Sequence, residues 1–134
     1  MAVTILMVDD EASLLEAVSE WYESQNTKVR VLSVSSGTEA YSKITSDKID
    51  ILITDEVMPG ERGSDILQRL AQEEQYKNIP VVMITGVQLN LIEDKIKDIP
   101  MNIKLLRKPF RFEELKEMVD PLVEQVIPLP PAYI

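Results

Sequence analysis

Five polar residues with the chemistry of an ion-binding site stand at or just beyond the ends of short apolar runs. They are two adjacent acids after residues 3–8, and then an acid, a hydroxyl and an amine at later runs: Asp9, Asp10, Asp55, Thr85 and Lys108. If these runs are parallel strands of one sheet, their carboxyl ends open into a common crevice. Three carboxylates that converge there repel one another unless a cation or a proton compensates their charge. The pattern therefore predicts a site for a hard divalent cation, Mg²⁺ above all.

A hydroxyl and an ammonium group extend the chemistry of this acidic cluster. Thr85 and Lys108 would let the site hold a tetrahedral anion, with the cation and the lysine balancing its charge. A phosphoryl group fits that description. A carboxylate is an established nucleophile in covalent catalysis, and phosphoryl transfer depends mainly on positioning and charge stabilisation. Asp55 is the best-placed nucleophile, and we expect it to be phosphorylated.

Each of these residues also has an ordinary structural explanation when it is taken alone. An acidic pair such as Asp9 and Asp10 commonly caps the helix that follows it. Asp55 precedes a Met-Pro-Gly sequence and suits a simple turn, Thr85 suits the start of a loop, and Lys108 suits a solvated surface. The coincidence of all five at strand ends is what favours a site.

The segments between the polar residues predict strands and helices in strict alternation. Four runs are continuous and rich in β-branched residues, which is typical of strands buried on both faces: residues 3–8, 51–53, 81–84 and 103–106. Residues 29–34 alternate more and indicate an edge strand, and the intervening segments have apolar residues at helical spacing. This α/β order predicts a flavodoxin-like (βα)5 fold, a doubly wound five-stranded parallel sheet with strand order 2-1-3-4-5.

Local signals set some of the helix boundaries. Ser36 with Glu39 has the form of a capping box at the start of the second helix, and Pro100 closes the fourth. Pro121 interrupts the last helical stripe, and a proline inside a helix costs about 3 kcal/mol. Because Asp120 and Pro121 are the residue types of an N-cap and a first helical position, we expect a kink or a restart there.

Length and composition limit the class of protein. The 134 residues suit one domain with a short tail, which we place at residues 1–127 and 128–134, the tail being rich in proline and extended. A net charge of −9 argues against direct nucleic-acid binding, and the absence of cysteine excludes disulfides and thiolate chemistry. No segment has the length of a transmembrane helix or a signal peptide, so we expect a cytoplasmic protein.

From Thr4 to about Val126 the chain resembles the receiver domains of response regulators in two-component systems. Four segments carry the resemblance, namely an acidic strand end, the phosphorylation strand with its turn, the threonine strand and the Lys-Pro-Phe signature: residues 9–11, IDILITDEVMPGERG at 49–63, residues 81–86 and residues 107–110. The resemblance implies a phosphoryl donor, either a sensor histidine kinase or a histidine phosphotransfer protein. The donor must lie outside this chain, or be a small acyl phosphate, because the chain contains no histidine.

The resemblance also implies a role for each site residue. Coordination of Mg²⁺ falls to three carboxylates, of which Asp9 acts largely through water, and to one backbone carbonyl: Asp9, Asp10, Asp55 and Val57. Thr85 and Lys108 would bind the phosphoryl oxygens, and the family keeps the peptide bond before Pro109 in the cis form. The signal would leave through the fourth helix, fifth strand and fifth helix to an unknown protein target, with a homodimer left open.

Three positions depart from the family. Leu105 replaces an aromatic residue that changes orientation on phosphorylation in receivers, so the signal is expected to travel by a different rearrangement. Val57 and Val87 flank the phosphoryl group and cannot orient a water molecule by hydrogen bonding. We therefore expect a long-lived phosphoaspartate.

Two other classes of function remain open beside the phosphorylatable switch. One is a metal-dependent phosphohydrolase on a similar sheet, although a substrate-pocket motif and a second general acid are missing. The other is a receiver-like interaction module that is never phosphorylated, suggested by Leu105 and the unusual tail. As a switch, the chain would not be an enzyme beyond catalysing its own phosphoryl transfer and slow autodephosphorylation.

Overall fold

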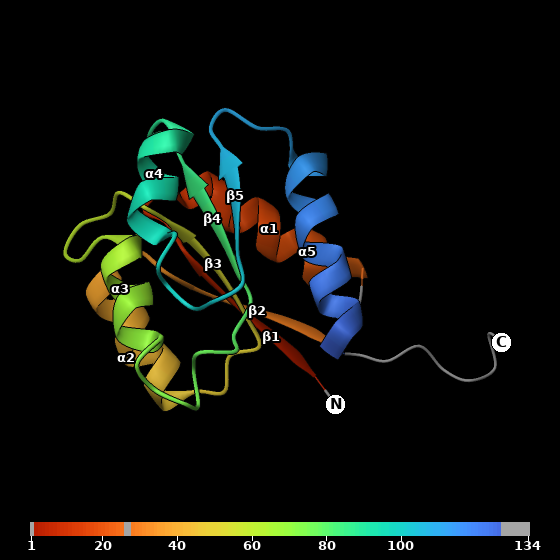
Figure 1. The fold of residues 1–134 in the computed structure, drawn as a ribbon. Helices are drawn as coiled ribbons and strands as arrows, with labels where there is room; N and C mark the ends of the chain where they lie inside the picture. Colours follow the sequence, from red (N-terminus) through yellow and green to blue (C-terminus); the bar gives the residue numbers. More distant parts are fainter. Residues whose placement is uncertain (1, 26–27, 127–134) are drawn as a thin grey trace, which may run out of the picture.

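Five parallel strands form the central sheet in the order β2-β1-β3-β4-β5 (Figure 1). The computed structural model describes residues 2–25 and 28–126. The strands, in chain order, are β1 Val3–Val8, β2 Val29–Val34, β3 Ile51–Asp55, β4 Val81–Thr85 and β5 Ile103–Arg107. The predicted α/β class, parallel sheet and strand order are confirmed.

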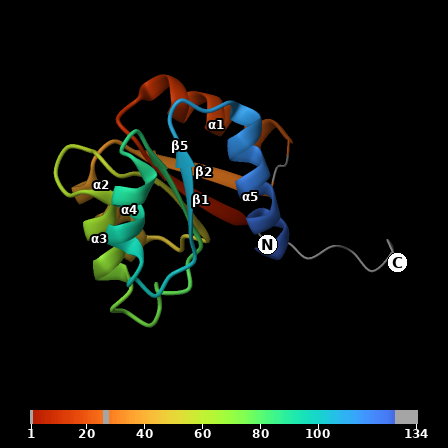
Figure 2. The same cartoon turned by 45° about the horizontal axis from the view of Figure 1, so that its top comes forward.

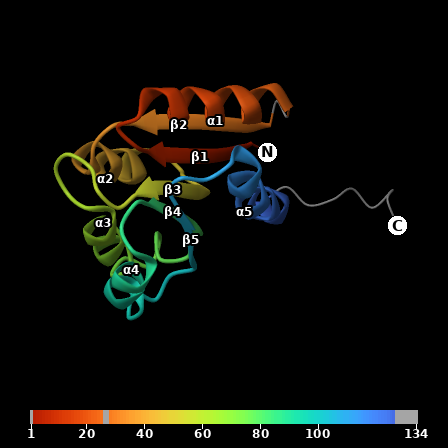
Figure 3. The ribbon, with the colours of Figure 1, turned by 90° about the horizontal axis from the view of Figure 1, so that it is seen from above.

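Helices cover both faces of the sheet. In chain order they are α1 Ala12–Gln25, α2 Gly37–Ser46, α3 Gly63–Leu70, α4 Leu89–Ile96 and α5 Phe112–Val126. α1 and α5 lie on one face and α2, α3 and α4 on the other, as the two turned views show (Figure 2 and Figure 3). This arrangement is the doubly wound layering that strict alternation predicts.

The sheet has one apolar core on each side, which explains the continuous apolar runs of the sequence. In β1, Ile5 and Met7 pack under α1 and α5, whereas Leu6 and Val8 pack under the other three helices. Every residue of β3 and β4 is buried. Edge strand β2 is only partly buried, as its alternating sequence indicated. Burial of each large aliphatic side chain contributes roughly 1.5–3 kcal/mol.

The predicted ends of α2 and α4 are confirmed with one adjustment. The side chain of Ser36 caps α2 and accepts a hydrogen bond from Glu39 N at 3.3 Å. The Glu39 carboxylate reaches back to Ser35 N at 3.4 Å, one residue earlier than a capping box requires. α4 ends at Ile96, and Pro100 follows after a turn.

The predicted restart of the last helix at Pro121 is wrong, because α5 continues through this residue. Val119 and Leu122 are buried on either side of the proline, so the helix packs against the core before and after it. Asp120 does not cap a new helix but accepts a hydrogen bond from the Tyr22 hydroxyl at 3.0 Å. Pro121 itself is exposed, which lets water reach the carbonyl that lacks a helical donor.

Two expectations concern the ends of the chain and its relation to membranes. The tail predicted at residues 128–134 and the domain end predicted at residue 127 lie outside the described residues. Across residues 2–25 and 28–126, no helix combines the length and the apolar character that crossing a membrane requires.

Candidate functional site

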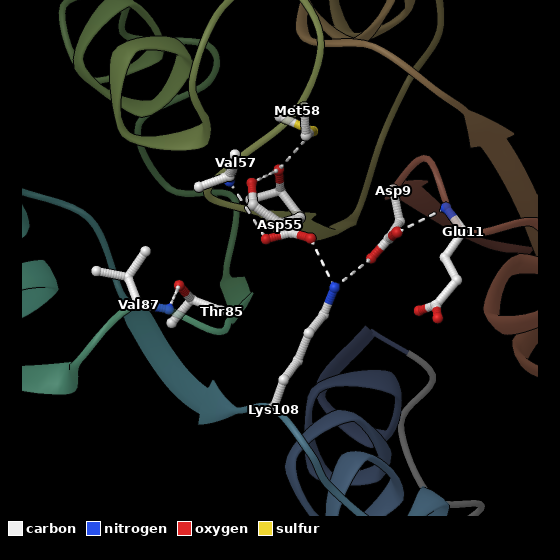
Figure 4. Close-up of polar contacts among 9 residues, drawn as sticks. Asp9, Glu11, Asp55, Val57, Met58, Thr85, Val87 and Lys108 are labelled. Atoms are coloured by element: carbon white, nitrogen blue, oxygen red, sulfur yellow. Dashed lines mark hydrogen bonds and ion pairs between the residues drawn. The ribbon is translucent and has the colours of Figure 1, made fainter.

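The predicted site residues meet at the carboxyl edge of the sheet, where Figure 4 shows Asp9, Asp55, Val57, Thr85 and Lys108. The register of the parallel pairs places Val8 beside Thr54 and Asp55 beside Ile84, so β1, β3 and β4 each end one residue apart from the neighbouring strand. Asp9, Asp10 and Asp55 each place a carboxylate oxygen within 4.8 Å of the other two. Lys108 extends from the loop after β5 toward the same point, and its backbone N–H is fixed to the Thr85 carbonyl at 2.8 Å.

Asp55 is the last residue of β3 and is only 6% exposed. Its Oδ2 accepts a hydrogen bond from Lys108 Nζ at 2.7 Å, and its Oδ1 accepts one from Val57 N at 3.3 Å. Burial lowers the pKa of Lys108, but hydrogen bonding to Asp55 and the charges of Asp55, Asp9 and Glu11 outweigh that effect and raise it. Lys108 therefore carries its positive charge at neutral pH.

Asp9 has a buried oxygen without a hydrogen-bond donor. Oδ1 accepts from Glu11 N at 2.8 Å, whereas Oδ2 has no hydrogen-bond partner within the described residues and lies 3.6 Å from Lys108 Nζ. Burial raises the pKa of Asp9, against the opposing effects of the Glu11 N–H and the Lys108 charge. A buried oxygen that faces two further carboxylates is what a bound cation would satisfy.

The ordinary structural explanation of the acidic pair is also partly correct. The bond from Glu11 N to Asp9 precedes the start of α1 at Ala12 and orders that turn. Asp10 is exposed and makes the acidic cluster accessible from solvent. The cluster thus combines one buried and structurally engaged carboxylate with one that faces water, and both flank Asp55.

Thr85 ends β4 with its side chain completely buried. Its hydroxyl accepts a hydrogen bond from Val87 N at 2.9 Å, so in this structure its partner is the loop after β4. The hydroxyl proton is left to donate elsewhere. The side chains of Val57, which is 54% exposed, and of Val87 lie nearby and offer no hydrogen-bonding group (Figure 4).

Glycines and a cis proline shape the loops around Asp55. A Cβ on Gly63 would lie 2.3 Å from the Asp55 carbonyl oxygen, so no side chain fits there. Gly60, in the Met-Pro-Gly turn, has a φ of 84°, which favours glycine. The Lys108–Pro109 peptide bond is cis, as expected.

Sequence reasoning missed Glu56. It follows Asp55 directly, is 0% exposed, and its carboxylate accepts hydrogen bonds from Ser64 N at 2.7 Å and Ser64 Oγ at 2.8 Å. Lys95 Nζ of α4 lies 3.3 Å from the same carboxylate. The available signal was an ionisable residue directly after a strand whose apolar run predicts burial on both faces, where a lone charge is too costly to leave unpaired.

An apolar cavity of about 580 Å³ adjoins the site. It lies between the start of α1 and the loop before α5, and its lining includes Leu14, Phe110 and Phe112 together with Lys108. The lysine that contacts Asp55 is therefore also reachable from this cavity.

Comparison with known proteins agrees with the geometry. Residues 5–120 match the family model of the response regulator receiver domain. That match covers most of the chain, and the chain therefore belongs to this family.

Individual relatives and solved structures support the assignment. The chain is 28% identical to the chemotaxis protein CheY of Pseudomonas aeruginosa over 122 residues, which are 91% of this chain and 97% of CheY. It is 31% identical to the regulatory protein VanR of Enterococcus faecium over 116 residues, or 86% of this chain. The structure of the chemotaxis response regulator CheY4 of Vibrio cholerae has a TM-score of 0.77 at 26% identity, covering 91% of this chain and 99% of that one.

The relatives differ in length. The chain spans 47% of VanR and 48% of the phosphate regulon transcriptional regulatory protein PhoB of Pseudomonas aeruginosa, about half the length of either. The receiver domain is what these proteins share with the chain.

Proposed function

We propose that this receiver domain is a phosphorylatable switch that accepts a phosphoryl group on Asp55 and signals by altered protein binding. One observation carries the proposal: a buried carboxylate at the end of β3 lies between two further carboxylates and a charged lysine. Neither a turn nor a helix cap needs that combination. Acting only on itself, the protein is a switch and not an enzyme with other substrates.

The acidic cluster has the donor set for Mg²⁺. We assign coordination to Asp10, Asp55 and the backbone carbonyl of Val57, with Asp9 acting largely through water. The bound cation would supply charge compensation between the carboxylates and the phosphoryl oxygens. The buried Oδ2 of Asp9, which has no hydrogen-bond donor among the described residues, and the exposed Asp10 support the assignment, since one offers an acceptor to a cation and the other gives access.

Asp55, Lys108 and Thr85 have different roles in the phosphoryl transfer. A carboxylate oxygen of Asp55 forms a bond to phosphorus, while the bond from phosphorus to the donor breaks and the donor nitrogen or oxygen keeps the electron pair. Both oxygens of Asp55 are engaged in this structure, so one of its contacts must be exchanged. Lys108 Nζ then contacts the phosphoryl oxygens, and the Thr85 hydroxyl donates its proton to one of them in a hydrogen bond.

The partners follow from the same assignment. The donor is a sensor histidine kinase or a histidine phosphotransfer protein in the cytoplasm, and the apolar cavity beside Lys108 offers it a docking surface. The downstream target protein binds to the surface formed by α4, β5 and α5. The residues of the phosphorylation site do not select this target.

Phosphorylation of the intact protein tests the proposal. The chain is incubated with Mg²⁺ and a small acyl phosphate, and its mass is measured under mild conditions. We expect a gain of one phosphoryl group that is lost in Asp55→Asn and retained in the exposed control Asp98→Asn. An adduct that persists in Asp55→Asn, or none in the wild type, would refute it. Repeated turnover of unrelated phosphoesters would instead show a phosphohydrolase.

A further inference from the structure

Glu56 joins three parts of the molecule at one buried carboxylate. It follows Asp55 in the chain, its Oε1 and Oε2 accept the two hydrogen bonds of Ser64 at the start of α3, and Oε2 pairs with Lys95 of α4. Glu56 is 0% exposed, whereas the Lys95 side chain is 47% exposed. A carboxylate without access to water is stable only with such partners. When Glu56 moves, Ser64 and Lys95 must therefore move with it.

α4 has few other anchors. Two of its side chains are buried, Ile92 and Ile96, whereas α3, which also has eight residues, buries three apolar side chains together with Gly63 and Ser64. A helix that buries little apolar surface can be displaced at a low cost in free energy. The ion pair to Glu56 is therefore a substantial part of what sets the position of α4.

The covalent route from the site to α4 is loosely packed. It runs from Thr85 through the loop at residues 86–88 to the first turn of the helix. Gly86 has no atom within 4 Å of the place where a Cβ would be, so the loop has room to change at this residue, whereas Val87 is held by its hydrogen bond to Thr85 Oγ1. A direct contact between side chains transmits a displacement more reliably than such a loop.

A change at the Asp55 carboxylate reaches Glu56 through the contact to Val57 N. The Asp55 carboxylate holds Val57 N and Lys108 Nζ, and a phosphoryl group on one oxygen removes or redirects one of these contacts. Glu56 lies between the two residues of the first contact. Its carbonyl also accepts a hydrogen bond from Gly63 N at 3.0 Å, which closes the loop onto α3.

From this geometry we infer that the Glu56–Lys95 ion pair couples the state of Asp55 to the position of α4. The inference rests on the proposed phosphorylation of Asp55 and assigns the route by which it reaches the surface. Glu56 and Lys95 are positioning residues, since neither contacts the reacting carboxylate in this structure. With Leu105 at the position where an aromatic side chain would respond, the ion pair supplies a second path.

Amide NMR of the full chain tests the coupling. Spectra are recorded with Mg²⁺, before and after addition of beryllofluoride, and fluorine NMR measures adduct formation independently. The variants Lys95→Met and Glu56→Gln break the ion pair from opposite sides, and the glutamine keeps the volume and an acceptor for Ser64. Lys95→Arg preserves the charge, and Lys97→Met removes a lysine of the same segment that pairs with exposed Asp94.

We expect all five proteins to form the adduct. In the wild type, Lys95→Arg and Lys97→Met, the amides of α4 should shift, and in Lys95→Met and Glu56→Gln most of that shift should be lost while the Val57 amide still responds. Unchanged α4 shifts in either of the last two variants would overturn the coupling alone. Absence of an adduct in the wild type would overturn the proposed function and the coupling with it.

Discussion

Replacing Asp9 by asparagine tests the interpretation of the acidic cluster. A buried carboxylate that favours a bound cation lowers the stability of the folded protein when no cation is present. Asp9 Oδ2 is buried without a hydrogen-bond donor, and an unsatisfied buried acceptor costs about 1–3 kcal/mol. In Asp9→Asn the Oδ1 bond from Glu11 N is kept, and the new amide can donate toward the carboxylates of Asp10 and Asp55. The loss to set against this gain is the ion pair to Lys108, which at 3.6 Å is not a hydrogen bond.

We therefore expect Asp9→Asn to be more stable than the wild type by about 1–2 kcal/mol at neutral pH without divalent cations. Urea unfolding followed by fluorescence of Trp21, the single tryptophan, measures the difference. Mg²⁺ should narrow or reverse the difference, because a cation that binds the folded state adds stability by mass action and binds more tightly to the wild type, which has one more carboxylate in the cluster. Asp98→Asn is the control and should change neither quantity.

The pH dependence of this difference has a definite sign. Burial raises the pKa of Asp9, so the folded protein binds this proton more tightly than the unfolded chain does. The cost of the charge is present above the raised pKa and disappears as the pH falls toward 3.8, the ordinary pKa of an aspartate. The advantage of Asp9→Asn should shrink over the same interval. A wild type at least as stable as the variant without cations, or equal stabilisation of both by Mg²⁺, would refute the reasoning.

Three further predictions follow from the loops and the helix contacts. Val57→Asn and Val87→Glu each introduce a group that orients water, so phosphoaspartate should decay faster than in the wild type, and unchanged or slower decay in both would contradict this. Gly63→Ala places a Cβ against the Asp55 carbonyl, and overpacking should lower the free energy of unfolding by about 1–3 kcal/mol; urea unfolding of Ala71→Gly, in a turn after α3, serves as the comparison. Tyr22→Phe removes the hydrogen bond to Asp120 and should cost about 0.5–1.5 kcal/mol, whereas a neutral effect would show that water replaces it fully.

The sequence predicted those features that depend on local pattern and on parallel topology. Apolar runs buried on both faces located the strands, and the rule that parallel strands end at one edge then brought Asp9, Asp55 and Lys108 together without further information. The cis peptide before Pro109 was expected only from the family resemblance.

The features that were missed depend on contacts between distant segments. Glu56 meets Lys95 from 39 residues away in the chain, and no periodicity indicates such a pair. Likewise, Asp120 was expected to cap a new helix because its local sequence permits it. Its hydrogen bond to Tyr22, 98 residues earlier, belongs to the packing that keeps α5 continuous.

The complete burial of β3 makes this strand a stable part of the protein, in contrast to parts that tolerate change. Asp55 is rooted in a strand flanked by β1 and β4, and amides of such a strand exchange with solvent only when the whole domain opens. α4 and the loops around the site are tied down by far fewer buried groups. On the function proposed above, substitutions on α4 can change which protein is recognised while Asp55 keeps its place, so that new signalling connections can evolve around unaltered chemistry.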